Sequence, residues 1–227
     1  MIGRRQLGAW GSAAVVTLLS GAALAETREQ LLVDKARIVV DEFLSSPILS
    51  NIRVYMQNAY GALIVPGLLR GGFLIGVEHG TGVMVARDPQ SGAWSDPAFF
   101  DLWGGSFGLQ LGGQSSDVIL TFMNQGAIDK LLSAKFKLGA DASAAVGTLG
   151  AGVGGGTTAQ FGEDVYVFAQ NVGLYGGLAL DGSAVLPLPD WNKAFYGQDL
   201  TPAQILQQRV VIDTPGAMAL RQALSKF

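Results

Sequence analysis

Glycine and bulky apolar residues alternate through the central run from Gly71 to Ala140, and this pattern limits the fold more than any other feature of the chain. Side chains of a strand point alternately to its two faces. Phe107, Leu109 and Leu111 alternate with small or polar residues, which predicts a strand with one bulky face and one bare face. Further apolar runs predict strands at residues 62–65, 73–77, 82–86, 118–122, 136–146, 153–160, 165–169 and 175–185. We expect 73–77 and 82–86 to pair as antiparallel neighbours.

Helical patterns flank these strands. Apolar residues recur at helical spacing from Glu26 to Leu44, and a second helical stretch runs from Ile52 to Tyr60. Residues 127–132 predict a short helix, and Thr-Pro pairs at 201–202 and 214–215 mark two helix starts. We therefore predict an α+β fold. Its sheet is mainly antiparallel and strongly twisted, either open or barrel-like, with N-terminal amphipathic helices and C-terminal helices.

The first 25 residues have the composition of a secretory signal. Arg4 and Arg5 precede an apolar run from Ala13 to Leu24, which ends in an Ala-Leu-Ala cleavage pattern. The run is shorter than the roughly 20 residues of a spanning helix, which disfavours the alternative of a permanent anchor. Paired arginines leave both the general secretory route and the twin-arginine route open. We expect an exported, periplasmic or peripherally envelope-associated protein.

The remaining residues, 26–227, have the length of one domain, with a helical extension from about residue 210. The Ala-, Gly- and Ser-rich interval 139–156 is expected to belong to this domain, the alternative being a flexible linker. The chain has no cysteine, which excludes disulfides, thiolate metal sites and a cysteine-linked lipid. Without the leader, 13 basic and 18 acidic residues give a net charge of about −5, which is not typical of a nucleic-acid binder.

Motifs that suggest catalysis lack the surroundings that catalysis requires. Gly104 to Gly108 matches the G-x-S-x-G pattern of serine hydrolases, but a strand pattern follows it where a helix is needed. The single histidine, His79, cannot complete the usual zinc site, and we expect it at a turn or strand edge. The glycines at 152–156 are followed by no phosphate-binding lysine. We predict no enzyme activity, no cofactor and no metal site.

The central run resembles the SYLF domain, a family of lipid-binding modules. The resemblance rests on GGFLIGVEHGTGVMVAR and the residues that follow, and it continues through 173–183 (GLYGGLALDGS) and 191–197 (WNKAFYG), so that it covers about residues 31–209. Eukaryotic members of the family bind phosphoinositides through a basic amphipathic N-terminal segment, and some fungal members also bind and bundle actin, but neither ligand is expected in a bacterial periplasm. For this chain the resemblance implies association with phospholipid. Many relatives carry Ser-Lys where this chain has Asn171-Val172, which weakens any charge-dependent role of that loop.

Two groups of residues are candidates for contact with lipid, because a surface helix can bury an apolar face while lysine and arginine meet anionic headgroups. The first group lies on the N-terminal helix, where acidic neighbours offset the cations, and packing in the core is the alternative. The second group lies around the short central helix, where an ordinary solvated face is the alternative. The candidate residues are Arg28, Leu32, Lys35, Arg37, Val39, Phe43, Lys130, Lys135 and Lys137.

The sequence therefore predicts a non-enzymatic module that binds anionic phospholipid at the bacterial cell envelope. Binding either occurs at the bilayer interface, through Leu32, Val39 and Phe43, or uses an apolar cavity lined by the sheet. The alternative is an envelope scaffold that recognises a partner protein through an edge strand or the C-terminal helix at 216–227.

Overall fold

The structure is a computed structural model, and it describes residues 26–47, 51–108, 113–133, 136–146, 162–172, 180 and 182–227. The predicted signal at 1–25, the predicted strand at 153–160, the glycines at 152–156 and Lys135 lie outside these residues. Within the described part of the chain, no helix is both long enough and apolar enough to cross a membrane.

One strongly curled sheet organises the chain, in the order β4-β7-β2-β1-β3-β6-β5. Neighbouring strands are antiparallel except β5 and β6, which are parallel. With helices beside this sheet, the fold is α+β, as predicted. The strands are β1 (Gly61–Ala86), β2 (Ala98–Gly108), β3 (Gly113–Phe122), β4 (Phe136–Lys137), β5 (Ala144–Val146), β6 (Val165–Val172) and β7 (Ala184–Pro187).

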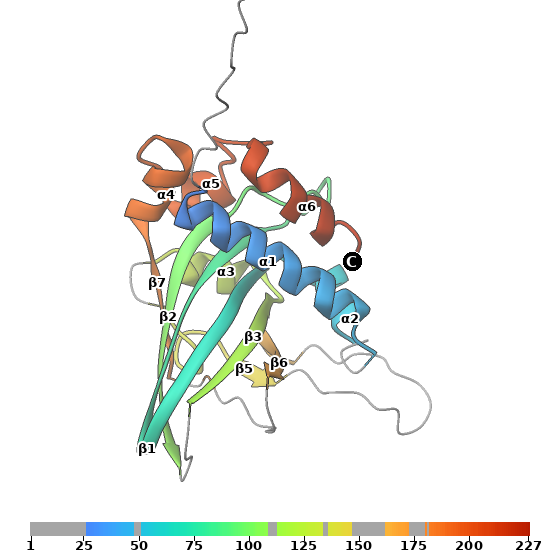
Figure 1. Cartoon of the computed structure of the whole chain (residues 1–227). Helices are drawn as coiled ribbons and strands as arrows, with labels where there is room; N and C mark the ends of the chain where they lie inside the picture. The colour runs from blue at the N-terminus through green and yellow to red at the C-terminus, as the bar shows by residue number, and fades with distance from the viewer. Residues whose placement is uncertain are drawn as a thin grey trace, which may run out of the picture.

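Strand β1 folds back on itself, so that it forms two antiparallel legs in the sheet (Figure 1). Residues 61–71 pair with β3, and residues 74–84 pair with β2. The legs lie side by side, because the amide of Arg87 donates to the carbonyl of Tyr60 at 2.7 Å. A Cβ atom at Gly82 would lie 2.5 Å from the carbonyl oxygen of Ile64. The predicted pairing of 73–77 with 82–86 is therefore wrong, since both segments belong to the second leg.

A β-bulge interrupts the first leg between Val65 and Leu68. Pro66 has no amide hydrogen to donate, and Gly67 adopts a φ of 65°, which is accessible to glycine at little cost. The Gly67 amide donates instead to the Asp117 carboxylate of β3, at 2.8 Å. The bulge reverses the alternation of inward and outward side chains beyond it, so Leu68 and Arg70 share a face of the sheet with Val65.

The helices lie mainly across one end of the sheet (Figure 1). They are α1 (Arg28–Ser45), α2 (Ile52–Asn58), α3 (Gln125–Leu131), α4 (Pro189–Tyr196), α5 (Pro202–Leu206) and α6 (Met218–Leu224), with a 3-10 turn η1 (Pro215–Ala217). The Thr201 hydroxyl caps α5 in a capping box with Gln204, as the Thr-Pro signal predicts. Thr214 makes no side-chain cap at η1. Helix α4 is not among the helices predicted from the sequence.

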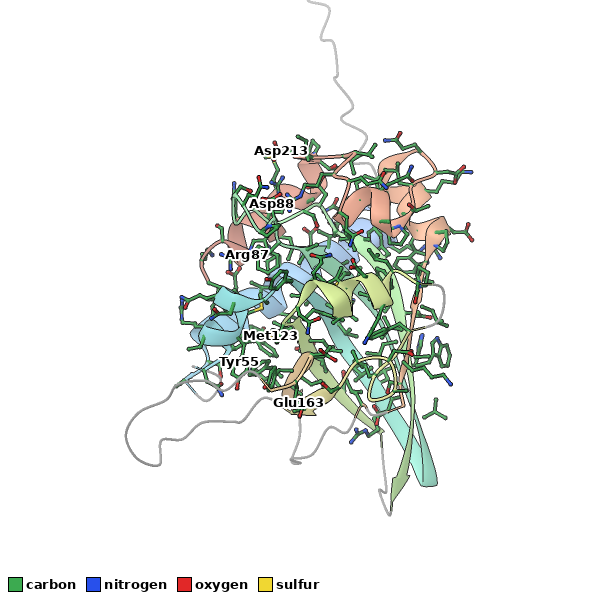
Figure 2. The ribbon with its side chains drawn as sticks, turned by 180° about the vertical axis from the view of Figure 1, so that it is seen from behind. Tyr55, Arg87, Asp88, Met123, Glu163 and Asp213 are labelled. Carbon is green, nitrogen blue, oxygen red and sulfur yellow. The ribbon has the colours of Figure 1, made fainter. Side chains whose placement is uncertain are left out.

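Apolar side chains are buried on both faces of the sheet. On the inner, concave face Leu63, Leu120, Phe100 and Phe136 pack with α3 and α5. On the outer face Ile64, Val83, Phe99 and Phe168 pack with α1, α2 and α6. Helix α2 docks through Tyr55, which Figure 2 labels. The Tyr55 ring centroid lies 4.6 Å from that of Tyr166 and 5.2 Å from that of Phe168. We call these two sets the inner core and the outer core.

Candidate functional site

From the sequence we expect three apolar residues of α1 to enter a membrane, but in the structure these residues face the outer core. Leu32, Val39 and Phe43 are 9%, 3% and 1% exposed, and they pack against the sheet and α6. A side chain in this position is already removed from water and gains nothing by entering lipid. The expectation that these three residues dip into headgroups is therefore wrong for this conformation, and the alternative of core packing is correct.

The cations of α1 are partly engaged by neighbouring groups. Arg28 lies over the Trp191 ring at 4.5 Å and pairs with Glu29 at 2.7 Å. Arg37 pairs with Asp41 at 2.8 Å, and Lys226 reaches the same carboxylate, which lowers the Asp41 pKa. Lys35 is exposed between the exposed Leu31 and Ile38, beside a hollow of about 260 Å³. This hollow is lined by Lys35, Ile38, Val39, Glu42, Pro66, Gly67 and Asp117.

Of the second basic group (Lys130, Lys135 and Lys137), the structure describes Lys130 and Lys137, and their side chains do not lie on the same surface. The Lys130 ammonium donates to the Asp141 carbonyl at 2.6 Å, and the Lys137 amide donates to the Asp141 carboxylate at 2.7 Å. In β4, Phe136 is buried in the inner core, so the exposed Lys137 side chain projects from the opposite, outer face. Lys137 therefore lies on the face of the sheet that α1 covers at its other end, whereas Lys130 belongs to α3.

Large apolar side chains are exposed on the part of the outer face that the helices leave uncovered. Leu69, Val77, Trp103 and Leu186 are 60%, 55%, 45% and 37% exposed. Figure 1 shows β1 and β2 extending well beyond the helices, as an arm of the sheet. Because α1 packs over the other half of this face, the sheet presents its own side chains to solvent here.

The strand registers place these side chains together. His79 pairs with Trp103, Trp103 with Ala184, and Ala184 with Lys137, so one row crosses four strands. Directly opposed residues share a face and lie about 5 Å apart. Arg70 on the first leg of β1 pairs with Glu78 on the second leg, on the inner face. Leu69 precedes Arg70 and His79 follows Glu78, so Leu69 and His79 lie next to each other on the outer face. We call this set the Trp103 surface: Leu69, Val77, His79, Trp103, Lys137 and Leu186.

A carboxylate fixes the aromatic residues of the Trp103 surface. The indole N–H of Trp103 donates to Asp101 Oδ2 at 2.9 Å, and the Thr81 hydroxyl donates to Asp101 Oδ1 at 2.9 Å. His79 Nε2 lies 3.0 Å from Asp101 Oδ1, and its ring centroid is 4.0 Å from that of Trp103. Trp103 therefore loses little additional conformational freedom when it contacts a ligand. His79 lies within a strand, not at the turn or strand edge that the sequence predicts.

The residues that suggested catalysis do not form a catalytic centre among the described residues. Ser106 lies within β2 and is followed by strand, so the turn of a nucleophile elbow is absent there. His79 and Asp101 lie at hydrogen-bond distance on the sheet surface. Within the same described residues, no cluster of three His, Asp or Glu side chains is arranged to hold a metal ion.

Residues 103–227 match the family model of Ysc84, described as Las17-binding protein actin regulator. This chain is 30% identical over 138 residues to the SH3 domain-containing YSC84-like protein 1 of Xenopus laevis. The aligned residues cover 60% of this chain and 41% of that protein. It is 29% identical over 169 residues to Protein YSC84 of Saccharomyces cerevisiae, which is 73% of this chain and 36% of that protein.

The match covers more than half of the chain, and the chain belongs to the Ysc84 family, which is the SYLF family that the sequence resembles. It spans about two fifths of the length of the curated relatives that it matches. The family description names binding and regulation, which are non-enzymatic in kind. The matched region begins at Trp103 and includes β3 and the C-terminal helices.

Sequence reasoning found one member of the Trp103 surface, Lys137, and missed its apolar members. Val77 and His79 alternate with Glu78 and Gly80, which identifies two faces but not which face is covered by helices. Trp103 and Leu186 come from strands far apart in sequence, so their proximity depends on the order of strands in the sheet.

Proposed function

We propose that this chain is a non-enzymatic module that binds the surface of phospholipid membranes through the Trp103 surface. The observation that carries this proposal is the exposure of Leu69, Val77, Trp103 and Leu186 on one uncovered face of the sheet. Tryptophan is enriched at the boundary between the headgroups and the hydrocarbon of a bilayer, because its ring is apolar and its N–H is polar. Exposed apolar clusters of this kind are typical of interaction sites.

The apolar members provide enough free energy for reversible association. Complete burial of one large apolar side chain is worth about 1.5–3 kcal/mol, and these four side chains are roughly half exposed, so their insertion contributes on the order of 4 kcal/mol. Lys137 at the edge of the surface adds about 1 kcal/mol on an anionic membrane. The expected binding is modest, and its electrostatic part is weakened by salt.

The proposal extends to the site of action in the cell. The signal pattern of residues 1–25 leads us to propose that the protein works after export, in the periplasm or at the surface of the bacterial cell envelope. Phosphatidylglycerol and cardiolipin are the anionic lipids against which we would test it. Arg28, Lys35 and Arg37 lie on the solvent side of α1, where Lys35 with Leu31 and Ile38 provides a secondary contact.

A second candidate function is protein binding, which the family description supports because it names Las17 binding. The C-terminal helix is poorly placed for this role, since Leu220, Ala223 and Leu224 of α6 are buried in the outer core against α1. The edge strands β4 and β5 span two and three residues, which limits pairing with an added strand. The Trp103 surface is the better candidate for a protein partner as well.

Vesicle flotation tests the lipid proposal with purified components. Residues 26–227, the chain without its predicted signal (the mature chain), are mixed with phosphatidylglycerol or phosphatidylcholine vesicles at low and high salt. We expect flotation with the anionic vesicles, and we expect the double variant Leu69→Ser, Val77→Ser to bind at least about tenfold more weakly. The matched control is Val210→Ser, Ile212→Ser, which alters two similarly exposed apolar residues outside the Trp103 surface and should bind as the wild type does.

Lys137→Glu separates the electrostatic contribution from the apolar one. This variant should lose affinity for phosphatidylglycerol but not for phosphatidylcholine, because only the anionic surface attracts the ammonium. Absence of wild-type flotation with every vesicle would reject lipid binding and favour a protein partner. Equal losses in the two double variants would reject the Trp103 surface as the site.

A further inference from the structure

We propose that His79 makes membrane binding by the Trp103 surface dependent on pH, so that uptake of one proton strengthens attachment to anionic lipid. The inference rests on the proposed function and adds its regulation. His79 is the only histidine of the chain. Its side chain is 40% exposed, and it is stacked on Trp103 within the surface that would meet the headgroups. A charge gained here is therefore gained at the contact itself.

The groups that face His79 come from each strand around it. From β1 they are Thr81 on the same leg and Leu69 on the other, and from β2 they are Asp101 and Trp103. Two strands further along the row, β4 contributes Lys137. Glu78 and Arg70 pair with each other on the inner face of the sheet and do not face the imidazole. Asp101 is thus the charged group in contact with the imidazole, and Lys137 lies three strands away, with the Asp141 carboxylate on its amide.

These neighbours make the charge of the surface depend on the imidazole. With neutral His79, the Asp101 carboxylate places a negative charge beside Trp103 in the surface. With protonated His79, an ion pair at 3.0 Å neutralises this negative charge, so the surface gains one positive charge at the contact with the membrane. Imidazole is the side chain that ordinarily changes charge between about pH 5 and pH 8.

The size of the effect follows from the interaction of one charge with an anionic membrane. One added positive charge near such a surface increases the partition constant about fivefold. The same proton has little effect on a zwitterionic surface, since no surface potential attracts it. The increase should also shrink at high salt, because mobile ions screen the membrane potential. These dependences separate charge regulation from a change of fold.

The test is the partition constant of the mature chain with phosphatidylglycerol and with phosphatidylcholine vesicles, at about pH 7.5 and about pH 5.5. We expect about fivefold tighter binding to phosphatidylglycerol at the lower pH and no change with phosphatidylcholine. His79→Gln should bind at both pH values as the wild type does at the higher one. His79→Lys, which carries a permanent charge, should bind at both values as the wild type does at the lower one.

The variants also distinguish the possible failures. The carboxyl groups of the chain are still present in His79→Gln, so a pH dependence that this variant retains overturns the assignment to His79. Wild-type binding that is equal at the two pH values overturns the inference but leaves lipid binding intact. Wild-type binding that is absent at both values overturns the proposed function together with the inference.

Discussion

Arg70 and Glu78 carry opposite charges inside the curled sheet, where they join the two legs of β1. Their side chains are 11% and 0% exposed, and Arg70 Nη2 lies 2.6 Å from Glu78 Oε1. Burial raises the pKa of Glu78, and the Arg70 guanidinium only partly offsets this effect. The ionised form of the Glu78 carboxyl group is therefore stabilised by Arg70, since a buried charge without a counter-ion is costly.

Arg70→Met should destabilise the protein by about 3–5 kcal/mol at neutral pH, because it leaves the Glu78 carboxylate buried without its cation. The raised pKa sets the sign of the pH dependence. Protonation of Glu78 is favoured by the fold, so the stability linked to it is present at acid pH and is lost as the pH rises through the folded-state pKa. The deficit of Arg70→Met should accordingly shrink on acidification. Urea unfolding of the wild type and of Arg70→Met at neutral and at acid pH measures this deficit in stability. A deficit that is the same at the two pH values would contradict this account.

Helix α1 has one face in the outer core and one face in solvent, and the two faces should respond differently to substitution. Phe43→Ala leaves a cavity between α1 and the sheet and should cost about 3–5 kcal/mol. Ile38→Ala removes an exposed side chain five residues earlier and should change the free energy of unfolding by less than about 0.5 kcal/mol. Thermal or urea unfolding of both variants checks this, and similar costs would show that the faces are misassigned.

The sequence predicted those elements whose signals are local. The predicted helix at 26–44 is confirmed as α1 at Arg28–Ser45, because the apolar period that predicts it lies within the element. Helix α4 was missed because Leu188, a residue with no capping oxygen in its side chain, precedes its proline. The reversal within β1 is predicted incorrectly, between residues 77 and 82, because both legs are apolar, although the Gly71-Gly72 pair at the true reversal is itself a turn signal.

At the scale of the whole molecule, the curled sheet separates an end covered by helices from an uncovered arm (Figure 1). The Trp103 surface forms on that arm from β1, β2, β4 and β7, which span more than a hundred residues of sequence. Sequence alone could identify the basic residue Lys137 but could not place it in the same row of the sheet as Trp103. The apolar residues of α1 were assigned to lipid because a helix that packs on a sheet and one that packs on a membrane have the same amphipathic pattern.

The orientation of the protein on a membrane is the most direct test of the proposed lipid surface. The chain has no cysteine, so one introduced cysteine carries a spin label at a single position. Labels at Val77→Cys and at Ile212→Cys, two exposed positions in different parts of the fold, are compared on phosphatidylglycerol vesicles. We predict that the Val77 label becomes protected from water-soluble relaxation agents and accessible to oxygen, while the Ile212 label stays in water. Equal exposure of both labels to water on vesicles that carry the protein would contradict the account.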